Sequence, residues 1–211
     1  MAFEEYDDYE QEQLVKEWLN NNWLTIVAGI ALGIGGLWGY GQWQNSNTQK
    51  NQAAATEFGQ IEQVLAMDEL TEAQSMINDY EANYGVNIYS IKARLSAAEK
   101  LVAAGDLAAA KTEYQAIIAA KPDKAIAEMT RIRLARLLVS EGEFTQASAE
   151  LNLVQSKAYQ TVVEEIVGDI HLAQGAIEKA RDAYQLALNE GEGYSGRQII
   201  EMKIADIKTA E

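Results

Sequence analysis

The chemistry open to this chain is limited by its reactive side chains. Its 211 residues include no cysteine and one histidine, His171. Most nucleophilic and metal-binding constellations are therefore excluded. Asp169 stands two residues before His171, and residues two apart on a helix face different directions, so the two are not expected to pair. We interpret His171 as a partly buried packing residue, and we expect no catalytic residue, cofactor, metal site or small-molecule substrate.

Charged side chains offer a second kind of chemistry, the recognition of a partner. The net charge of −15 argues against nucleic acid and against a basic membrane-binding patch. Four arginines fall on segments that are expected to form the inner helices of a repeat solenoid, and such helices line its concave face. We predict that they line a groove for a partner segment; the alternative is that they are ordinary surface charges. They are Arg94, Arg131, Arg133 and Arg136.

A charge-free stretch at residues 23–43, WLTIVAGIALGIGGLWGYGQW, is predicted to cross a lipid bilayer as one helix. No charged residue lies between Glu17 and Lys50, and about 20 residues at ~1.5 Å each span the ~30 Å hydrocarbon core. Trp23 stands at one end, with Trp38 and Trp43 near the other, as aromatic rings do at membrane interfaces.

The glycines of this stretch form two small-xxx-small pairs, Gly29 with Gly33 and Gly35 with Gly39. Such pairs let a second membrane helix approach closely. The other interpretation is that membrane helices simply tolerate glycine. The run GIGGLWGYG is not a phosphate-binding loop, because no strand precedes it and it lies in the predicted membrane span.

Residues 1–22 are acidic, with seven carboxylates and one basic residue, Lys16. A cleaved signal peptide has a positive start and a short apolar run, so we expect a retained signal anchor. Lys16 and Lys50 flank the span evenly, and the positive-inside rule returns no orientation. The aromatic residues among the carboxylates indicate either a flexible, solvated start, which we favour, or a docking motif for a soluble partner; they are Phe3, Tyr6 and Tyr9.

Residues 44–211 are predicted to be all-α, with glycines at regular breaks between helical segments. Aligning the chain on Gly105, Gly142 and Gly175 places alanine five residues later and a large apolar residue nine later in each copy. Small residues also stand seven before each glycine, and Pro122 ends the first copy with Asp123 as the next helix cap. The aligned residues are Ala98, Ala135 and Gly168; Ala110, Ala147 and Ala180; Tyr114, Leu151 and Tyr184; and Ile117, Val154 and Ala187.

A fourth, degraded copy precedes these three, with Asp68 in place of glycine and with Ala73, Ile77 and Tyr80 behind it. The pattern resembles the tetratricopeptide repeat, which implies an α-solenoid of about four helical hairpins. An amphipathic segment at 197–209 is predicted to cap its C-terminal end. Residues 53–67 would cap the other end, either continuous with the membrane helix or separated from it by a polar hinge.

The combination of the EEYDDYEQEQLVKEWLNNNW lead, the Gly-rich span and the GDIHLAQG segment resembles the ancillary SecYEG translocon subunits of Gram-negative bacteria over the whole chain. The resemblance implies an inner-membrane protein with a cytoplasmic N-terminus and a periplasmic repeat domain. It also implies two partners, the SecYEG translocon and a PpiD-like membrane-anchored periplasmic chaperone. The implied roles are to help hand over emerging proteins and, on the cytoplasmic side, to dampen the Rcs stress phosphorelay. The alternative is a general membrane-tethered scaffold for another envelope complex. An enzyme is disfavoured. The expected domains are residues 1–22, 23–43 and 44–211.

Overall fold

The computed structural model describes residues 8–191 and 193–209, and no residue in these ranges forms a strand. The chain divides into two units, Met1–Ala55 and Thr56–Glu211. The all-α fold expected from the sequence is confirmed.

The predicted membrane span lies inside one helix, α1 (Asp8–Ala66). The helix is unbroken over these residues, so the polar hinge considered from the sequence is absent and the expected capping segment belongs to the same element. It is long and apolar enough to cross a membrane, and none of its apolar window is buried in the protein. Trp23 and Leu37 are more than half exposed. Such a surface requires an apolar surrounding, which a bilayer supplies.

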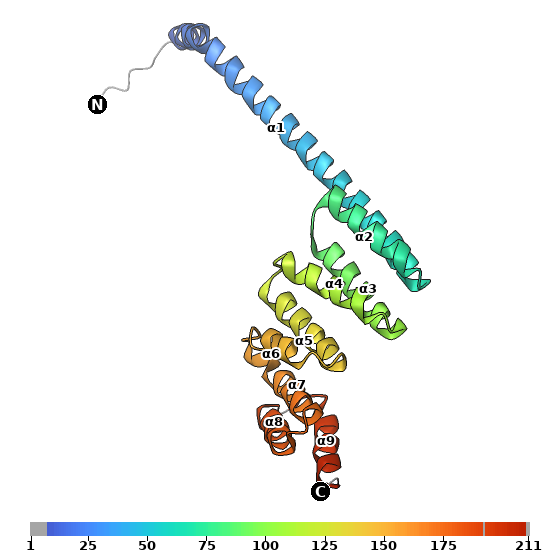
Figure 1. Ribbon diagram of the computed structural model, residues 1–211. Helices are drawn as coiled ribbons and strands as arrows, with labels where there is room; N and C mark the ends of the chain where they lie inside the picture. Colours follow the sequence, from blue (N-terminus) through green and yellow to red (C-terminus); the bar gives the residue numbers. More distant parts are fainter. Residues whose placement is uncertain (1–7, 192, 210–211) are drawn as a thin grey trace, which may run out of the picture. The chain divides into compact units, whose positions relative to one another are not determined.

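The second unit is a stack of helical hairpins (Figure 1). Each helix packs mainly on its neighbours in sequence, and α5 also contacts α7. This nearest-neighbour packing is the mark of a solenoid. From Thr56 onward the elements are the end of α1 with α2 (Leu70–Tyr84), α3 (Ile88–Ala104) with α4 (Leu107–Ala119), α5 (Lys124–Ser140) with α6 (Phe144–Leu151), the short 3₁₀ helix η1 (Lys157–Tyr159), α7 (Gln160–Ala173) with α8 (Ile177–Glu190), and α9 (Arg197–Thr209).

The turns inside the hairpins have the backbone that the repeat pattern predicts. Gly105, Gly142 and Gly175 have φ of 82°, 79° and 74°, in the left-handed region that glycine adopts without strain. Asp68, which takes the glycine's place in the degraded copy, also has a positive φ of 59°. This match supports reading the first hairpin as a fourth copy.

The connection between α4 and α5 follows its predicted chemistry. Pro122 lies between the two helices, and the Asp123 side chain accepts a hydrogen bond from the Ile126 amide at 3.1 Å. Proline cannot continue a helix, and the aspartate satisfies an amide of the next one. Both expectations are confirmed.

The aligned small and large residues form the core of each hairpin. The alanines five residues after each glycine are fully buried, and so is Tyr184. Gly168 lies against that tyrosine: a Cβ built on it would stand 2.4 Å from the ring. The two helices of this hairpin can therefore be as close as they are only because residue 168 has no side chain.

One aligned position differs from its counterparts. Ile117 and Ala187 lie on the second helices of their hairpins, whereas α6 ends at Leu151, before Val154. The Glu128 carboxylate of α5 accepts a hydrogen bond from the Gln155 amide at 2.9 Å. This buried acceptor holds the chain in a turn where the other copies continue as helix.

The C-terminal helix caps the stack as expected. Ile200, Ile204 and Ile207 of α9 are buried in one cluster with Tyr184 and Ala187 of α8. The end of a solenoid must cover the apolar face of its last hairpin, and α9 provides that cover.

We predict that Gly168→Ala destabilises the protein by about 1–3 kcal/mol, because the new methyl group overpacks the site against Tyr184. The matched control is Gly59→Ala in α1, where a Cβ meets nothing within 4 Å. That change should be neutral or stabilise by up to about 1 kcal/mol through helix propensity. Thermal unfolding of both variants in detergent measures the difference, and equal effects would contradict the close approach.

Candidate partner-binding groove

Arg94 of α3 lies at the junction of three helices rather than in an open groove. Its guanidinium binds both oxygens of Glu81 in α2, at 2.9 and 2.7 Å, and Glu113 in α4 at 2.6 Å. The Arg94 side chain is 11% exposed and that of Glu113 is 5% exposed. Hydrogen bonding to Glu81 raises the pKa of Arg94 against the opposing effect of burial. The charge of Arg94 is therefore neutralised by carboxylates of the protein itself.

Arg131 repeats this arrangement in the next hairpin, where it pairs with Glu150 of α6. In both hairpins the arginine stands nineteen residues before its glutamate. Each arginine lies eleven residues before the turn glycine, so the pair is a feature of the repeat. Sequence reasoning missed it, although the equal spacing of opposite charges in two aligned copies was a visible signal.

Arg133 and Arg136 of α5 are placed differently from Arg94 and Arg131. Arg133 lies beside Tyr114, where its charge opposes the rise that burial gives the pKa of that tyrosine. The Arg136 side chain is half exposed, and its only salt-bridge partner among the described residues, Glu165, is 3.6 Å away. The structure thus brings two of the four predicted arginines together on one helix face, and it separates them from the other two.

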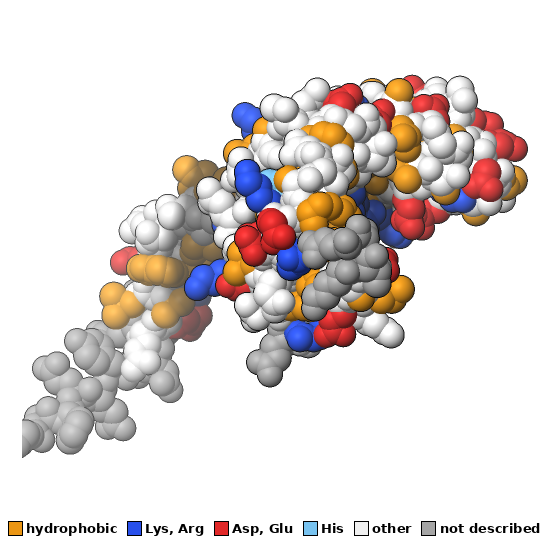
Figure 2. All heavy atoms as spheres, turned by 60° about the horizontal axis from the view of Figure 1, so that its bottom comes forward, with side chains coloured by type: hydrophobic (Ala, Val, Ile, Leu, Met, Phe, Trp, Pro, Cys, Tyr) orange, Lys and Arg blue, Asp and Glu red, His pale blue; other side chains and the backbone are white. Residues whose placement is uncertain are grey.

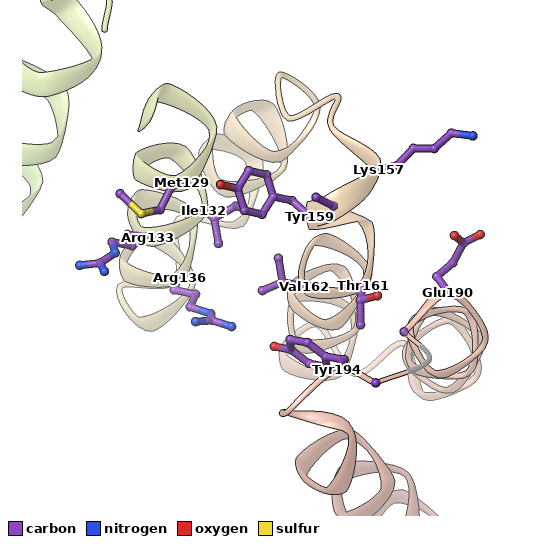
Figure 3. A pocket seen from close by; sticks show the side chains of 13 residues that line it. Met129, Ile132, Arg133, Arg136, Lys157, Tyr159, Thr161, Val162, Glu190 and Tyr194 are labelled. Atoms are coloured by element: carbon purple, nitrogen blue, oxygen red, sulfur yellow. The ribbon is translucent and has the colours of Figure 1, made fainter. Parts of the chain in front are cut away.

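A hollow of about 600 Å³ opens between α5, η1, the start of α7 and the loop before α9. Figure 3 shows Arg136 pointing into the space beside Tyr194, with Ile132 and Val162 in its floor and Tyr159 above. Lys157 and Glu190 point away at the far edge. The hollow therefore combines an apolar floor with one inward-pointing cation.

A second hollow, of about 470 Å³, lies on the other side of α5, toward α3 and α4. Val102, Leu107 and Leu137 give it an apolar part, and Glu99 and Ser140 also line it. Arg133 and Arg136 line both hollows, and in Figure 3 Arg133 points away from Tyr159 and Val162. The two arginines form a shared wall between the hollows.

An ion-pair network connects this wall to the C-terminal cap. Lys203 of α9 binds Glu165 at 2.9 Å and Asp169 at 2.7 Å, and Tyr184 donates to Asp169 at 2.6 Å. Tyr194 donates to Glu165 at 3.1 Å. Burial lowers the pKa of Lys203, but the bonds to Asp169 and Glu165 outweigh it and the net pKa is raised. Burial and the Asp169 bond raise the pKa of Tyr184. The lysine stays charged and holds α9 on α7.

The remaining predicted residues lie elsewhere. His171 is half-buried in the last turn of α7, and the carboxylate of Asp169 binds Tyr184 and Lys203. Added Cβ atoms at the predicted contact glycines of α1 would meet nothing within 4 Å; they are Gly29, Gly33, Gly35 and Gly39. Over residues 8–191 and 193–209, no group of three His, Asp or Glu side chains is arranged to hold a metal ion.

These features define a class of protein, an α-solenoid of helical hairpins carried on an apolar helix, with surfaces suited to binding. The chain matches the tetratricopeptide repeat-like domain over residues 16–209, and it belongs to that family. The solved structure of MamA 41-end from Desulfovibrio magneticus RS-1 has a similar fold, with a TM-score of 0.53 and 17% identity over 74% of this chain and 88% of that one.

Curated relatives match nearly from end to end. The ancillary SecYEG translocon subunit of Aggregatibacter actinomycetemcomitans is 26% identical over 96% of this chain and 99% of its own length. The protein of the same name from Haemophilus influenzae is 24% identical over 98% and 100%, and that from Escherichia coli is 22% identical over 95% and 97%.

We predict that Arg94→Ala destabilises the protein by about 3–5 kcal/mol, because it leaves the buried Glu113 and the half-buried Glu81 carboxylates without their cation. Arg197→Ala is the control, since its ion pair with Glu201 is about half exposed and its hydrogen bond to the Leu188 carbonyl lies at the surface; the expected cost is about 1–2 kcal/mol. Thermal unfolding in detergent compares the two variants. Similar losses of stability in the two variants would mean that burial does not increase the contribution of the Arg94 ion pairs to stability.

Glu128 gives a pH-dependent prediction. Hydrogen bonds from Ser156 and the Gln155 amide lower its pKa below the usual 4.5. The unfolded carboxylate takes up a proton first as the pH falls, so the stability that Glu128 contributes is present above about pH 4.5 and is lost as pH falls through the folded pKa. Glu128→Gln should therefore destabilise the protein at pH 7 and much less at pH 3. Unfolding curves at both values test this, and a difference independent of pH would contradict it.

Proposed function

We propose that this protein is a non-catalytic ancillary subunit of the SecYEG translocon, anchored in the bacterial inner membrane by α1. The observation that carries the proposal is the end-to-end match to relatives of that name, which includes both the apolar helix and the repeat unit. A match to the repeats alone would support only a binding scaffold, since this architecture hosts many functions.

The two units support complementary roles. A membrane helix confines the solenoid to the neighbourhood of the translocon, and a tethered binder needs only weak contacts because its effective concentration is high. The solenoid provides an extended surface for a protein partner. We propose that this partner is a PpiD-like membrane-anchored periplasmic chaperone, and that the pair helps hand over proteins as they emerge.

The proposed topology places residues 1–22 in the cytoplasm, 23–43 in the bilayer and 44–211 in the periplasm. Lys16 and Lys50 leave the positive-inside rule balanced, so the orientation rests on the family resemblance. The acidic tail would then be the segment available for dampening the Rcs phosphorelay; its residues 1–7 lie outside the described part of the chain.

The membrane helix is also a proposed contact surface. The two glycine pairs of α1 lie on neighbouring sides of the helix at ~100° per residue, with Leu32 between them and Ile34 opposite. Open space around the glycines leaves room for a second helix to approach. A translocon helix would therefore contact the Leu32 side in preference to the Ile34 side.

Site-specific photo-crosslinking in native membranes tests the proposal. A photoreactive residue in place of Leu32 should give crosslinks to translocon subunits, and the same residue in place of Ile34 should give several-fold fewer. A topology reporter fused after Glu211 should read periplasmic. Crosslinks only to other envelope proteins would replace the proposal with a general membrane-tethered scaffold. Equal crosslinking yields at positions 32 and 34 would show that the glycine faces of α1 are not the contact surface.

A further inference from the structure

Two hollows that share Arg133 and Arg136 lie on either side of these arginines of α5, and we call the pair of hollows the arginine trough. We propose that the arginine trough binds a partner segment in which a carboxylate side chain is flanked by large apolar side chains. The inference rests on the proposed function for the statement that the partner is a protein, and it deepens that function by naming the chemistry of the bound segment.

Two cations without a close carboxylate argue for an acidic ligand at this place, against the net negative charge of the repeat unit. Residues 44–211 carry 25 acidic and 16 basic side chains, and several cations lie close to carboxylates: Arg94, Lys111 and Lys203 each have one at 2.9 Å or less. Within the described residues, Arg133 pairs with no carboxylate and is hydrogen-bonded to Tyr114. The carboxylate contact of Arg136 is the one of 3.6 Å to Glu165, and Arg136 is also hydrogen-bonded to Tyr194. The trough therefore keeps two guanidinium groups available in a unit with excess acid.

Arg136 can change partner without leaving a buried charge uncompensated. Glu165 is 9% exposed, so an unpaired charge there would be costly. It already accepts hydrogen bonds from Lys203 at 2.9 Å and from Tyr194 at 3.1 Å. A ligand carboxylate that draws Arg136 away thus leaves Glu165 satisfied. A planar guanidinium matches a carboxylate with two parallel hydrogen bonds, which favours this ligand over a neutral one.

The apolar side chains that line the two hollows determine which ligand side chains flank the carboxylate. Ile132 and Val162 line the first hollow, and Val102 and Leu137 line the second. Their volumes, about 600 and 470 Å³, are in the range of ~300–1,000 Å³ of clefts that hold ligands. Because the arginines stand between two apolar hollows, apolar side chains on either side of the acid would each find a place to be buried.

The repeat unit as a whole supplies no broad basic field, because its acidic side chains outnumber its basic ones. Figure 2 shows acidic and basic side chains interleaved over the visible face, with hydrophobic patches between them. An acidic partner is therefore recognised by local contacts rather than by a broad attraction, and single substitutions in the trough should have measurable effects.

The first half of the test varies the ligand. The full chain in lipid nanodiscs is titrated into a fluorescein-labelled eight-residue probe peptide with a central aspartate flanked by leucine and phenylalanine, and binding is followed by anisotropy. A second probe carries asparagine for aspartate, and a third carries serines for the apolar residues. We expect each change to weaken binding about tenfold. Equal binding of the first two probes would overturn the proposal.

The second half varies the protein. Arg133→Gln and Arg136→Gln should each raise the Kd of the aspartate probe about tenfold, whereas Lys179→Gln, the same charge change at an exposed position of α8, should leave it unchanged. Equal effects of all three would reject the trough. Tm measurements report whether each variant folds, and if one does not, the probe comparison on the unaltered chain decides the question.

Failure of this inference is distinguishable from failure of the proposed function. Loss of probe selectivity with translocon crosslinks from position 32 intact would reject the trough alone. Selective probe binding without those crosslinks would leave an acidic-peptide-binding scaffold that serves another complex.

Discussion

The close contact between a small residue on one helix and a large ring on the next is the constraint on which the repeat unit depends. At Gly168 and Tyr184 the helices are near enough that even a methyl group would collide with the ring. Alanines stand at the corresponding positions of the other hairpins, where Ala98 and Ala135 are completely buried. These contacts set the distance between paired helices, and the hairpins can then stack with a continuous core.

Cations in this protein serve two separate purposes. Inside the hairpins they join helices: Arg94 and Arg131 each reach a glutamate nineteen residues later, and Lys203 fastens the last helix. On α5, Arg133 and Arg136 stand between two hollows, where Arg133 has no carboxylate partner among the described residues and Arg136 has Glu165 at 3.6 Å. Removing a cation of the first kind leaves buried or half-buried carboxylates without their partner and costs stability, whereas a cation of the second kind is available to a partner.

The exposed apolar surface of the membrane helix and the side chains of the solenoid each narrow the roles that this chain can have. A helix with more than half of its large apolar side chains in contact with solvent or lipid cannot be the core of an aqueous domain. The solenoid, in turn, carries no constellation of reactive groups within the described residues. The described residues offer two kinds of surface suited to recognition, the apolar face of α1 and the hairpin surface of the repeat unit.

The sequence by itself determined the elements, because they depend on local rules. The charge-free run predicted α1, the regular glycines predicted the left-handed turns, and the amphipathic segment at 197–209 predicted the cap. It also located four arginines on inner helices, but it could not show which of them are paired inside the protein. Whether an arginine is paired depends on carboxylates that fold back from another helix, as Glu81 and Glu113 do for Arg94. The early end of α6 likewise follows from Glu128, 27 residues before the amide that it binds. Tertiary structure alone decided these points, because the partner in each case is distant in sequence and close only after the hairpins stack.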